Sequence, residues 1–266
     1  MTETSNSQHI IPRHEEILEI LTKNRVVEVA QLSDQLGVSA VTIRSDLDTL
    51  DRRLLLRRIR GGATSVQPAR FVRPLDLPSQ SFGAEKGRIG AMAARMVRDG
   101  ETIILDAGTT TKAMAIAMPK ELRDVVVITS SLEVAISLEE HPGVTVMLTG
   151  GTVKKTGRNP LSRSLIPPFA GLLLAQINAD CAYLCCAGVD ANHGFTNAHF
   201  EEVEVKRAML TASRRAVMLG DHGKIGHVAV AKIASIDEVA TLVTDKGATL
   251  SDIQKLKAEG VDVISA

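Results

Sequence analysis

The sequence predicts an α/β protein built from a small helical module followed by a larger domain with a mostly parallel sheet. Apolar residues recur at helical spacing through the first 50 residues. After about residue 84, short apolar runs alternate with amphipathic helical stretches; the runs are "TIILD", "VVVITS", "VTVMLTG", "CAYLCCAG", "AVMLGD" and "EVATLVTD". Strands that alternate with helices indicate βαβ units, whose sheets are mostly parallel.

The composition is that of an ordinary globular protein. The 266 residues are enough for one medium domain and one small domain, with 44% hydrophobic and 23% charged residues. Only 2% of the residues are aromatic, so the core must be aliphatic. The 31 basic and 31 acidic residues balance, so the overall charge indicates no particular partner. No apolar run reaches 18 residues and the first residues lack a signal core, so we expect a soluble, cytoplasmic chain with no membrane partner.

The cysteines and histidines indicate neither a disulfide framework nor a metal site. Cys181, Cys185 and Cys186 all fall in "CAYLCCAG", and their odd number does not suggest paired disulfides. Free cysteine behaves as a small hydrophobe, so a buried strand is expected there. The histidines of the second half (His193, His199, His222 and His227) show no metal-ligand spacing. We therefore expect no metal and no cofactor.

The first 50 residues predict a helix-turn-helix. A first helix ends near Lys23, and a second carries Leu32 and Leu36 on one face. Gly37 can adopt the positive φ angle that ends a helix. Ser39 is a good N-cap for a third helix, in which apolar residues again recur at helical spacing. Two short helices around a tight glycine turn make this motif.

A β-wing and a linker are expected next. "LLLRRIRGGA" predicts a strand that turns at Gly61 and Gly62. Residues 64–83 contain three prolines with Ser and Gln, which is typical of a linker. We therefore expect a winged helix-turn-helix domain over residues 1–63 and a sheet domain over residues 84–266.

The side chains of this module suit DNA. On the third helix, the face opposite Ile43 and Leu47 carries hydroxyls and a guanidinium that can reach phosphates and base edges in the major groove. Between residues 52 and 73 lie seven arginines and no acidic residue, as a DNA backbone requires. The predicted contacts are Ser39, Thr42, Arg44, Ser45, Arg57, Arg58 and Arg60. The alternative is a helical pair that only dimerises, since residues 1–50 contain eight acidic and four basic residues.

Both halves together resemble the DeoR (glycerol-3-phosphate repressor-like) family of bacterial transcription regulators. The resemblance runs from about Pro12 to Ile264 and rests on "LGVSAVTIRSDLDTL", "RIRGGA", "EKGRIGAMAARMVRDGETIILDAGTTT", "TGG", "GVDANHGFTN", "KRAM", "GDHGKIG" and "VTD". It implies a winged helix-turn-helix and a second domain similar to ribose-5-phosphate isomerase. In this family the second domain typically binds a phosphorylated sugar, which changes operator binding.

Four segments at strand ends predict an effector site, because ligands of open α/β sheets bind at the carboxyl ends of strands. Glycines allow close backbone approach, hydroxyls and Lys can bind phosphate, and Asp can accept bonds from sugar hydroxyls. The predicted residues are Asp106, Gly108, Thr109, Thr110 and Thr111 in "DAGTTT", Thr129 and Ser130 in "TSS", Gly150 and Gly151 in "TGG", Asp190 in "GVD", and Lys224 in "GDHGK".

Each segment alone could be only a turn or a helix cap. An isomerase needs a positioned general base, and no feature singles out Asp106, Asp190 or Glu202 for that role. We therefore expect a repressor of carbohydrate catabolism genes that senses a phosphorylated sugar without converting it. The expected partners are double-stranded operator DNA, the sugar phosphate and further copies of the chain in a dimer or tetramer. The alternatives are an isomerase-like enzyme with an appended helical domain, and an architectural DNA-binding protein whose large domain only oligomerises.

Overall fold

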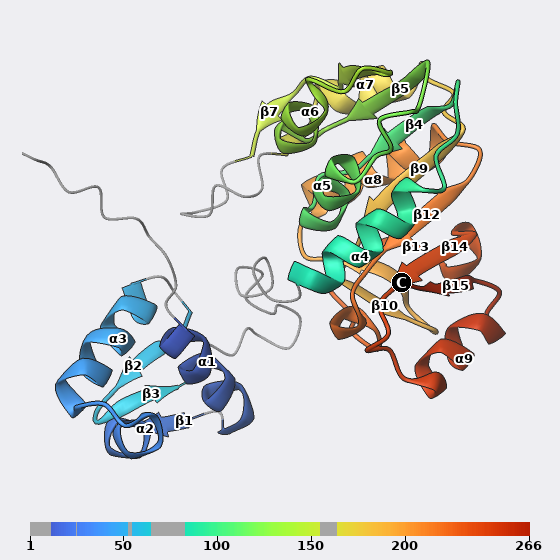
Figure 1. Cartoon of the computed structure of the whole chain (residues 1–266). Helices are drawn as coiled ribbons and strands as arrows, with labels where there is room; N and C mark the ends of the chain where they lie inside the picture. Colours follow the sequence, from blue (N-terminus) through green and yellow to red (C-terminus); the bar gives the residue numbers. More distant parts are fainter. Residues whose placement is uncertain (1–11, 25, 53–54, 65–82, 155–163) are drawn as a thin grey trace, which may run out of the picture. The chain divides into compact units, whose positions relative to one another are not determined.

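The computed structural model divides into two compact units, Met1–Leu77 and Pro78–Ala266 (Figure 1). It describes residues 12–24, 26–52, 55–64, 83–154 and 164–266. The predicted linker, residues 64–83, lies outside the described residues except at its two ends. Among the described residues, none of the helices combines the length and apolar composition needed to cross a bilayer.

The first unit is a winged helix-turn-helix, as predicted. Its elements are α1 (Pro12–Asn24), β1 (Val26–Glu28), α2 (Val29–Leu36), α3 (Ala40–Arg52), β2 (Arg57–Ile59) and β3 (Gly62–Thr64). Gly37 ends α2 with a φ of 64°, in the left-handed region that glycine adopts readily. Ile17, Leu32, Ile43 and Leu47 bring the three helices together in one buried core. The three strands pair antiparallel in the order β1-β3-β2, which forms the wing.

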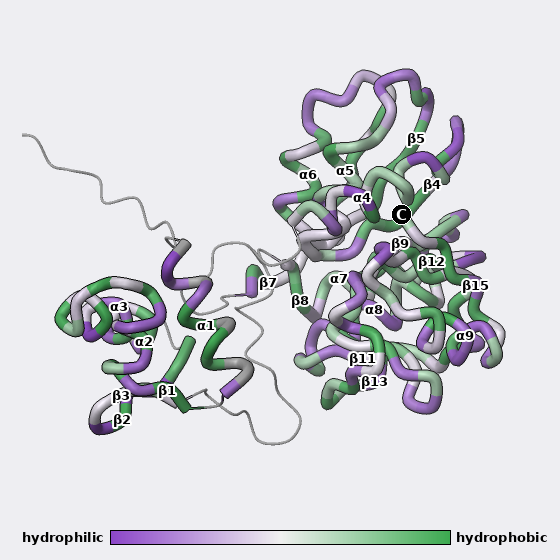
Figure 2. The backbone as a smooth tube through the Cα atoms, turned by 60° about the horizontal axis from the view of Figure 1, so that its bottom comes forward, coloured by the Kyte–Doolittle hydropathy of each residue, from purple (hydrophilic) through white to green (hydrophobic). Residues whose placement is uncertain are grey.

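The second unit is built on a seven-stranded sheet in the order β15-β14-β12-β9-β4-β5-β6, and every pair in it is parallel. The strands are β4 (Thr102–Leu105), β5 (Val125–Thr129), β6 (Val144–Leu148), β9 (Cys181–Cys185), β12 (Ala216–Leu219), β14 (Thr241–Thr244) and β15 (Asp262–Ser265). In Figure 2, which colours each residue by its hydropathy, hydrophobic residues are seen along β4, β5 and β9. The three cysteines are buried free thiols, and burial raises the pKa of Cys181 and Cys186 to about 11.

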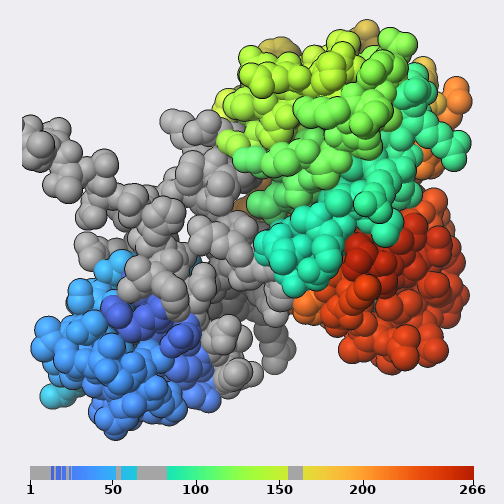
Figure 3. Space-filling model, viewed as in Figure 1, coloured from blue at the N-terminus to red at the C-terminus, as the bar shows by residue number. Residues whose placement is uncertain are grey.

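Helices cover both faces of this sheet. On one face α4 (Gly83–Ala94), α5 (Thr109–Ile116) and α6 (Leu132–Leu138) share a core with the strands; α4 and α5 are seen from outside in Figure 3. On the other face lie α7 (Phe169–Leu174), α8 (Phe200–Thr211) and α9 (Leu250–Ala258). A second, antiparallel sheet joins this side, with β10 (Gly188–Asp190), β11 (Gly194–Asn197) and β13 (Ala231–Ala234). The remaining elements are β7 (Thr152–Val153), β8 (Leu165–Ile166) and the 3-10 turns η1 (His222–Lys224) and η2 (Ile236–Glu238).

A glycine allows α4 to lie directly against α5. A Cβ added at Gly90 would stand 2.6 Å from the backbone N of Met114 and 2.7 Å from the backbone C of Ala113. Gly87, one turn earlier on α4, has nothing within 4 Å of the same position. The close contact therefore depends on one of the two glycines.

We predict that Gly90→Ala lowers the free energy of unfolding of the second unit by about 1–3 kcal/mol, because the backbone of α5 must move away. Gly87→Ala is the matched control and should raise it by about 0.5–1 kcal/mol, since alanine favours a helix over glycine. Denaturant unfolding followed by circular dichroism measures both. Equal effects of the two substitutions would contradict the close contact.

Candidate DNA-binding surface and effector site

The third helix presents the predicted DNA-contacting residues on its solvent side. Ser39 caps α3, because its Oγ accepts a hydrogen bond of 3.2 Å from the backbone N–H of Thr42. The hydroxyl oxygens of the two residues lie 2.9 Å apart. Arg44 and Ser45 are exposed, whereas Ile43 of the opposite side is fully buried. The four predicted residues therefore lie together over the first turns of α3.

Asp46 fixes this helix from the inside. Its carboxylate accepts hydrogen bonds from Arg13 Nε at 2.7 Å and Nη2 at 3.1 Å, and His14 Nε2 lies 3.0 Å away. Burial alone would raise the pKa of Asp46, but the bonds from Arg13 and His14 outweigh it and lower the pKa below its ordinary value. This contact was not predicted from the sequence, although Asp46 stands three residues after the buried Ile43, on the inward side.

The wing arginines differ in their surroundings. Arg57 and Arg60 are exposed. Arg58 instead joins the wing to α3: its Nε pairs with Asp48 at 2.9 Å, and its Nη1 donates to the carbonyl of Gly62 at 2.9 Å. Of the other predicted cluster members, Arg53, Arg70 and Arg73 lie outside the described residues, and only the backbone of Arg52 is described.

In the second unit, a buried ion pair joins Asp106 to Lys206. Asp106 follows β4, and its Oδ2 also accepts a hydrogen bond of 2.9 Å from the backbone N–H of Cys185, at the end of β9. Lys206, on α8, donates a second bond of 3.0 Å to the carbonyl of Cys185. Burial works against the charge of Lys206, but the attraction of Asp106 outweighs it and raises the pKa of the lysine. The pair therefore ties two central strands to a helix at the carboxyl edge of the sheet.

A small pocket surrounds this ion pair. It measures about 10 Å³, and its walls are formed by Asp106, Ala107, Ser130, Ser164, Leu165, Glu202, Val205 and Lys206. Two of the predicted effector residues, Asp106 and Ser130, thus line one pocket. The buried Ser164 Oγ has no hydrogen-bond partner within the described part of the chain. A volume of this size holds about one water molecule.

Glu202 forms a polar network on the α8 side of the pocket. Its Oε1 accepts a hydrogen bond of 2.7 Å from Lys154 Nζ, and its Oε2 accepts one of 2.7 Å from Asn197 Nδ2. Burial alone would raise the pKa of Glu202, but Lys206, Lys154 and Asn197 together lower it. The carboxylate is therefore held ionised, with both oxygens already bonded.

The "DAGTTT" segment begins α5 beside this pocket. Gly108 lies so close to β9 that an added Cβ would stand 2.7 Å from Cys185 Sγ. Thr111 Oγ1 donates to the carbonyl of Asp106 at 2.7 Å, so its hydroxyl stabilises the loop. Thr110 is buried, and its hydroxyl has no hydrogen-bond partner among the residues described. Thr109 is partly buried. Thr129, at the end of β5, donates its hydroxyl to the carbonyl of Leu105 at 2.6 Å.

Two further lysines lie near these strand ends. Lys224, in the η1 turn after β12, is partly buried with its Nζ 3.7 Å from Asp221 Oδ2. Lys86, on α4, is buried; burial lowers its pKa, and the nearby charge of Lys224 lowers it further. Lys86 and Lys206 were not predicted as site residues, although "EKGRIG" and "KRAM" contain them.

Three predicted residues make other contacts. Gly150 and Gly151 have φ angles of 70° and 130° in the turn from β6 to β7, where a Cβ on Gly151 would stand 2.4 Å from the carbonyl O of Ile166. Asp190 ends β10 of the antiparallel sheet and closes its own turn, with His193 Nδ1 2.7 Å from its Oδ1. That bond to His193, assisted by two backbone N–H groups, lowers the pKa of Asp190. None of the three lines the small pocket.

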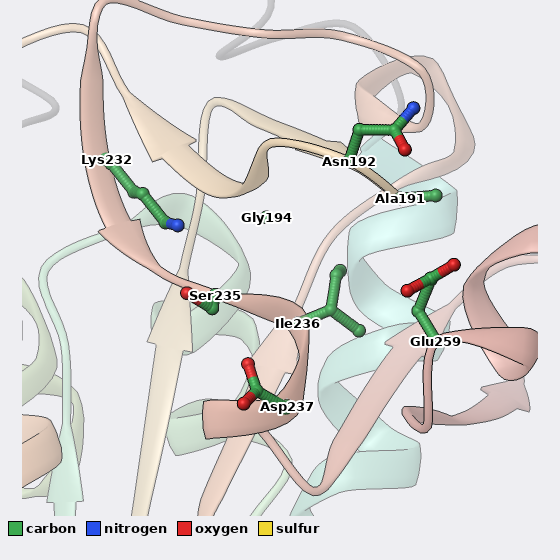
Figure 4. Close-up of a pocket in the computed structure, with 8 residues that line it drawn as sticks. All are labelled: Ala191, Asn192, Gly194, Lys232, Ser235, Ile236, Asp237 and Glu259. Atoms are coloured by element: carbon green, nitrogen blue, oxygen red, sulfur yellow. The ribbon is translucent and has the colours of Figure 1, made fainter.

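A larger pocket, of about 210 Å³, lies elsewhere in the second unit (Figure 4). It is lined by Ala191, Asn192, Gly194, Lys232, Ser235, Ile236, Asp237 and Glu259, and its charged groups are exposed. None of the predicted effector residues is among them. The small pocket is the better candidate because Asp106 and Lys206 are buried and therefore act with little screening by water. Among the described residues, no three or more His, Cys, Asp or Glu side chains are placed to hold a metal ion.

We predict that Lys206→Met lowers the free energy of unfolding of the second unit by about 3–5 kcal/mol, because it leaves the Asp106 carboxylate buried without its counter-ion. The exposed Lys232→Met is the control and should change stability little. Adding Asp106→Asn to Lys206→Met should recover part of the loss, since no charge then remains buried. If the single and double variants were equally unstable in denaturant titrations, the ion pair would not be the cause.

Comparison with protein families shows two matches along the chain. Residues 13–69 match the DeoR-like helix-turn-helix domain, and residues 81–246 match the DeoR C terminal sensor domain. The HTH-type transcriptional regulator GolR of Listeria innocua is 32% identical over 94% of this chain and 96% of its own length. The glycerol-3-phosphate regulon repressor of Haemophilus influenzae is 28% identical over 87% of this chain and 88% of its own length.

Among solved structures, the chain is similar to the ribose 5-phosphate isomerase from Plasmodium falciparum, with a TM-score of 0.38, 16% identity and coverage of 53% of this chain and 52% of that one. A TM-score of 0.38 is too low to carry an inference about function. The family matches, in contrast, cover the DNA-reading module and most of the sheet domain, and the relatives are named as regulators and not as enzymes. The chain therefore belongs to the DeoR family of helix-turn-helix transcriptional regulators.

Proposed function

We propose that this regulator represses carbohydrate catabolism genes and that a phosphorylated sugar, bound around the Asp106–Lys206 pair, controls it. The observation that carries the proposal is the concentration of buried and partly buried lysines and of unpartnered hydroxyls at the carboxyl edge of the parallel sheet. Lys206 lies in the small pocket and Lys86 and Lys224 lie near it, while Ser164 Oγ and Thr110 Oγ1 lack partners among the described residues. Buried polar groups are normally hydrogen-bonded, so unpartnered ones favour a ligand site.

The two ends of such a ligand have suitable partners. Lys86, Lys224 and the backbone N–H groups at the start of α5 can bind a phosphate. Ser164 Oγ and the Asn197 amide can bond to sugar hydroxyls. The names of relatives support a ligand of this class, because one of them is a repressor of a glycerol-3-phosphate regulon.

The size of the pocket supports sensing. A volume of about 10 Å³ does not admit a sugar phosphate, so the ligand must displace part of the wall. A ligand that binds only one of two conformations shifts the population toward it, which is what a regulator requires. The alternative function, an isomerase-like enzyme, would need a free general base. Both carboxylate oxygens of Glu202 are already bonded.

For operator binding, we propose that Ser39, Thr42, Arg44 and Ser45 meet the major groove and that Arg57 and Arg60 neutralise phosphates. Arg58 can add a phosphate contact only while it also holds Asp48 and Gly62. A helix-turn-helix reads one half-site per copy, so we also propose that the regulator acts as a homo-oligomer.

Replacing both Arg57 and Arg60 by Ala should weaken binding to specific and random double-stranded DNA alike. It should flatten the slope of log affinity against log salt by about one unit for each lost phosphate contact. The exposed Arg95→Ala, just after α4, is the control and should leave the slope unchanged. A wild-type slope in the double variant would remove these arginines from the interface.

Phosphorylated sugars should raise the melting temperature of the chain, and their unphosphorylated forms should not. With the most stabilising compound, Lys224→Ala should weaken binding by about tenfold to a hundredfold, the loss expected for one charge-assisted hydrogen bond. Lys232→Ala is the control because this lysine is exposed. Titration calorimetry decides the matter: equal affinities would exclude Lys224 from the ligand site, and no stabilisation by any sugar phosphate would reject the effector class.

A further inference from the structure

Five large apolar side chains are exposed on adjoining elements of the second unit. They are Met147 of β6, Val153 of β7, Phe169 and Leu172 of α7, and Phe200 of α8, with exposed fractions between 43% and 68%. We name this set the apolar rim. Exposed patches of this kind mark interaction sites, whereas single exposed apolar residues need no explanation.

Contacts between these elements show that the elements of the rim adjoin one another. A Cβ on Gly150, just after β6, would stand 3.9 Å from Phe169 Cβ, which joins the end of β6 to α7. β7 pairs with β8, and α7 contacts both β8 and α8. The Lys154–Glu202 ion pair, with Nζ and Oε1 2.7 Å apart, joins the end of β7 to the first turn of α8.

The rim borders a face of β6 that is left exposed by the residues the structure describes. β6 is an edge strand, and its register places Thr145 and Met147 on the same face as Val126 and Ile128 of β5. On this face Ile128 is buried, but Thr145 and Met147 are exposed. The opposite face of β6 packs against α6. Parallel sheets are normally covered on both faces, whereas the described residues leave this face of β6 open.

From this surface we infer that the apolar rim is the interface between two copies of this chain, each of which covers the open face of β6 in the other. The inference rests on the proposed homo-oligomeric regulator and gives that assembly a location. A patch that meets a second copy of itself suits a two-fold dimer, because the exposed side chains of α7 in one copy can then cover the open face of β6 in the other. Two copies are also what a helix-turn-helix needs to read two half-sites.

The area and the charge of the rim fit this occupant. With about 150 Å² for each of these side chains, the lower end of the range for aromatic ones, the exposed fractions give roughly 400 Å² of apolar surface per copy. A stable interface buries about 800 Å² per partner, of which somewhat more than half is apolar. The charges between β7 and α8, Lys154 and Glu202, neutralise each other, so two copies meet there without like-charge repulsion.

The test uses the full chain and sedimentation velocity over a wide range of concentrations. Wild type should self-associate, and the double variant Phe169→Glu, Leu172→Glu should do so at least about a hundredfold more weakly, because facing carboxylates repel each other and lose water. Leu250→Glu is the matched control, since Leu250 is an exposed apolar residue on α9, outside the rim. It should associate like wild type.

A monomeric wild type, or a double variant that associates as strongly as wild type, would overturn the interface. Circular dichroism of the double variant should match wild type, because both substituted side chains are exposed and the core is unchanged. Stabilisation by a phosphorylated sugar is measured on the same samples. Loss of association in the double variant together with no stabilisation of wild type would reject the proposed effector and leave the interface standing.

Discussion

The effector half of the molecule depends on the buried ion pair between Asp106 and Lys206. It joins β4, β9 and α8 at one point, because both partners also bond to the backbone of Cys185. A buried ion pair adds little net stability compared with apolar packing, but it is costly to break on one side. Its main effect is therefore geometric: it holds the helix that carries Glu202 against the end of the central strands. An arriving anion would compete with Asp106 for Lys206, and this competition would connect ligand binding to the position of α8.

A buried carboxylate joins separate elements at two other places in the chain. Asp46, on the recognition helix α3, binds Arg13 of α1. Asp245 binds the η1 turn through the backbone N–H and Nδ1 of His222, at 2.8 Å each. In each case a buried carboxylate joins elements that are distant in sequence. An aliphatic core with few aromatic groups packs without strong directional preference. The three carboxylates supply directional bonds that such a core lacks.

Much of the fold could be predicted from local patterns, and the site only in part. Helical spacing around Ile43 and the glycine at position 37 are short-range signals, and so are the apolar runs of the parallel strands. Asp106 and Ser130, both chosen because they follow strands, line one pocket; that this pocket binds the effector stays a prediction. Lys206 and Glu202 reach that pocket from a helix about a hundred residues later. Spacing within a short stretch of sequence cannot predict that residues so far apart lie together. Asp190 ends a strand of the antiparallel sheet, to which the rule for parallel sheets does not apply.

The recognition helix α3 packs into the fold with one face and presents the predicted DNA contacts on the other. Ile43, Asp46 and Leu47 hold it in the fold, while Arg44 and Ser45 are exposed and make no contribution to the core. Substitutions on the exposed face therefore carry little cost in stability. After gene duplication, copies of such a regulator can diverge in the operators they read while the module that presents the helix stays the same.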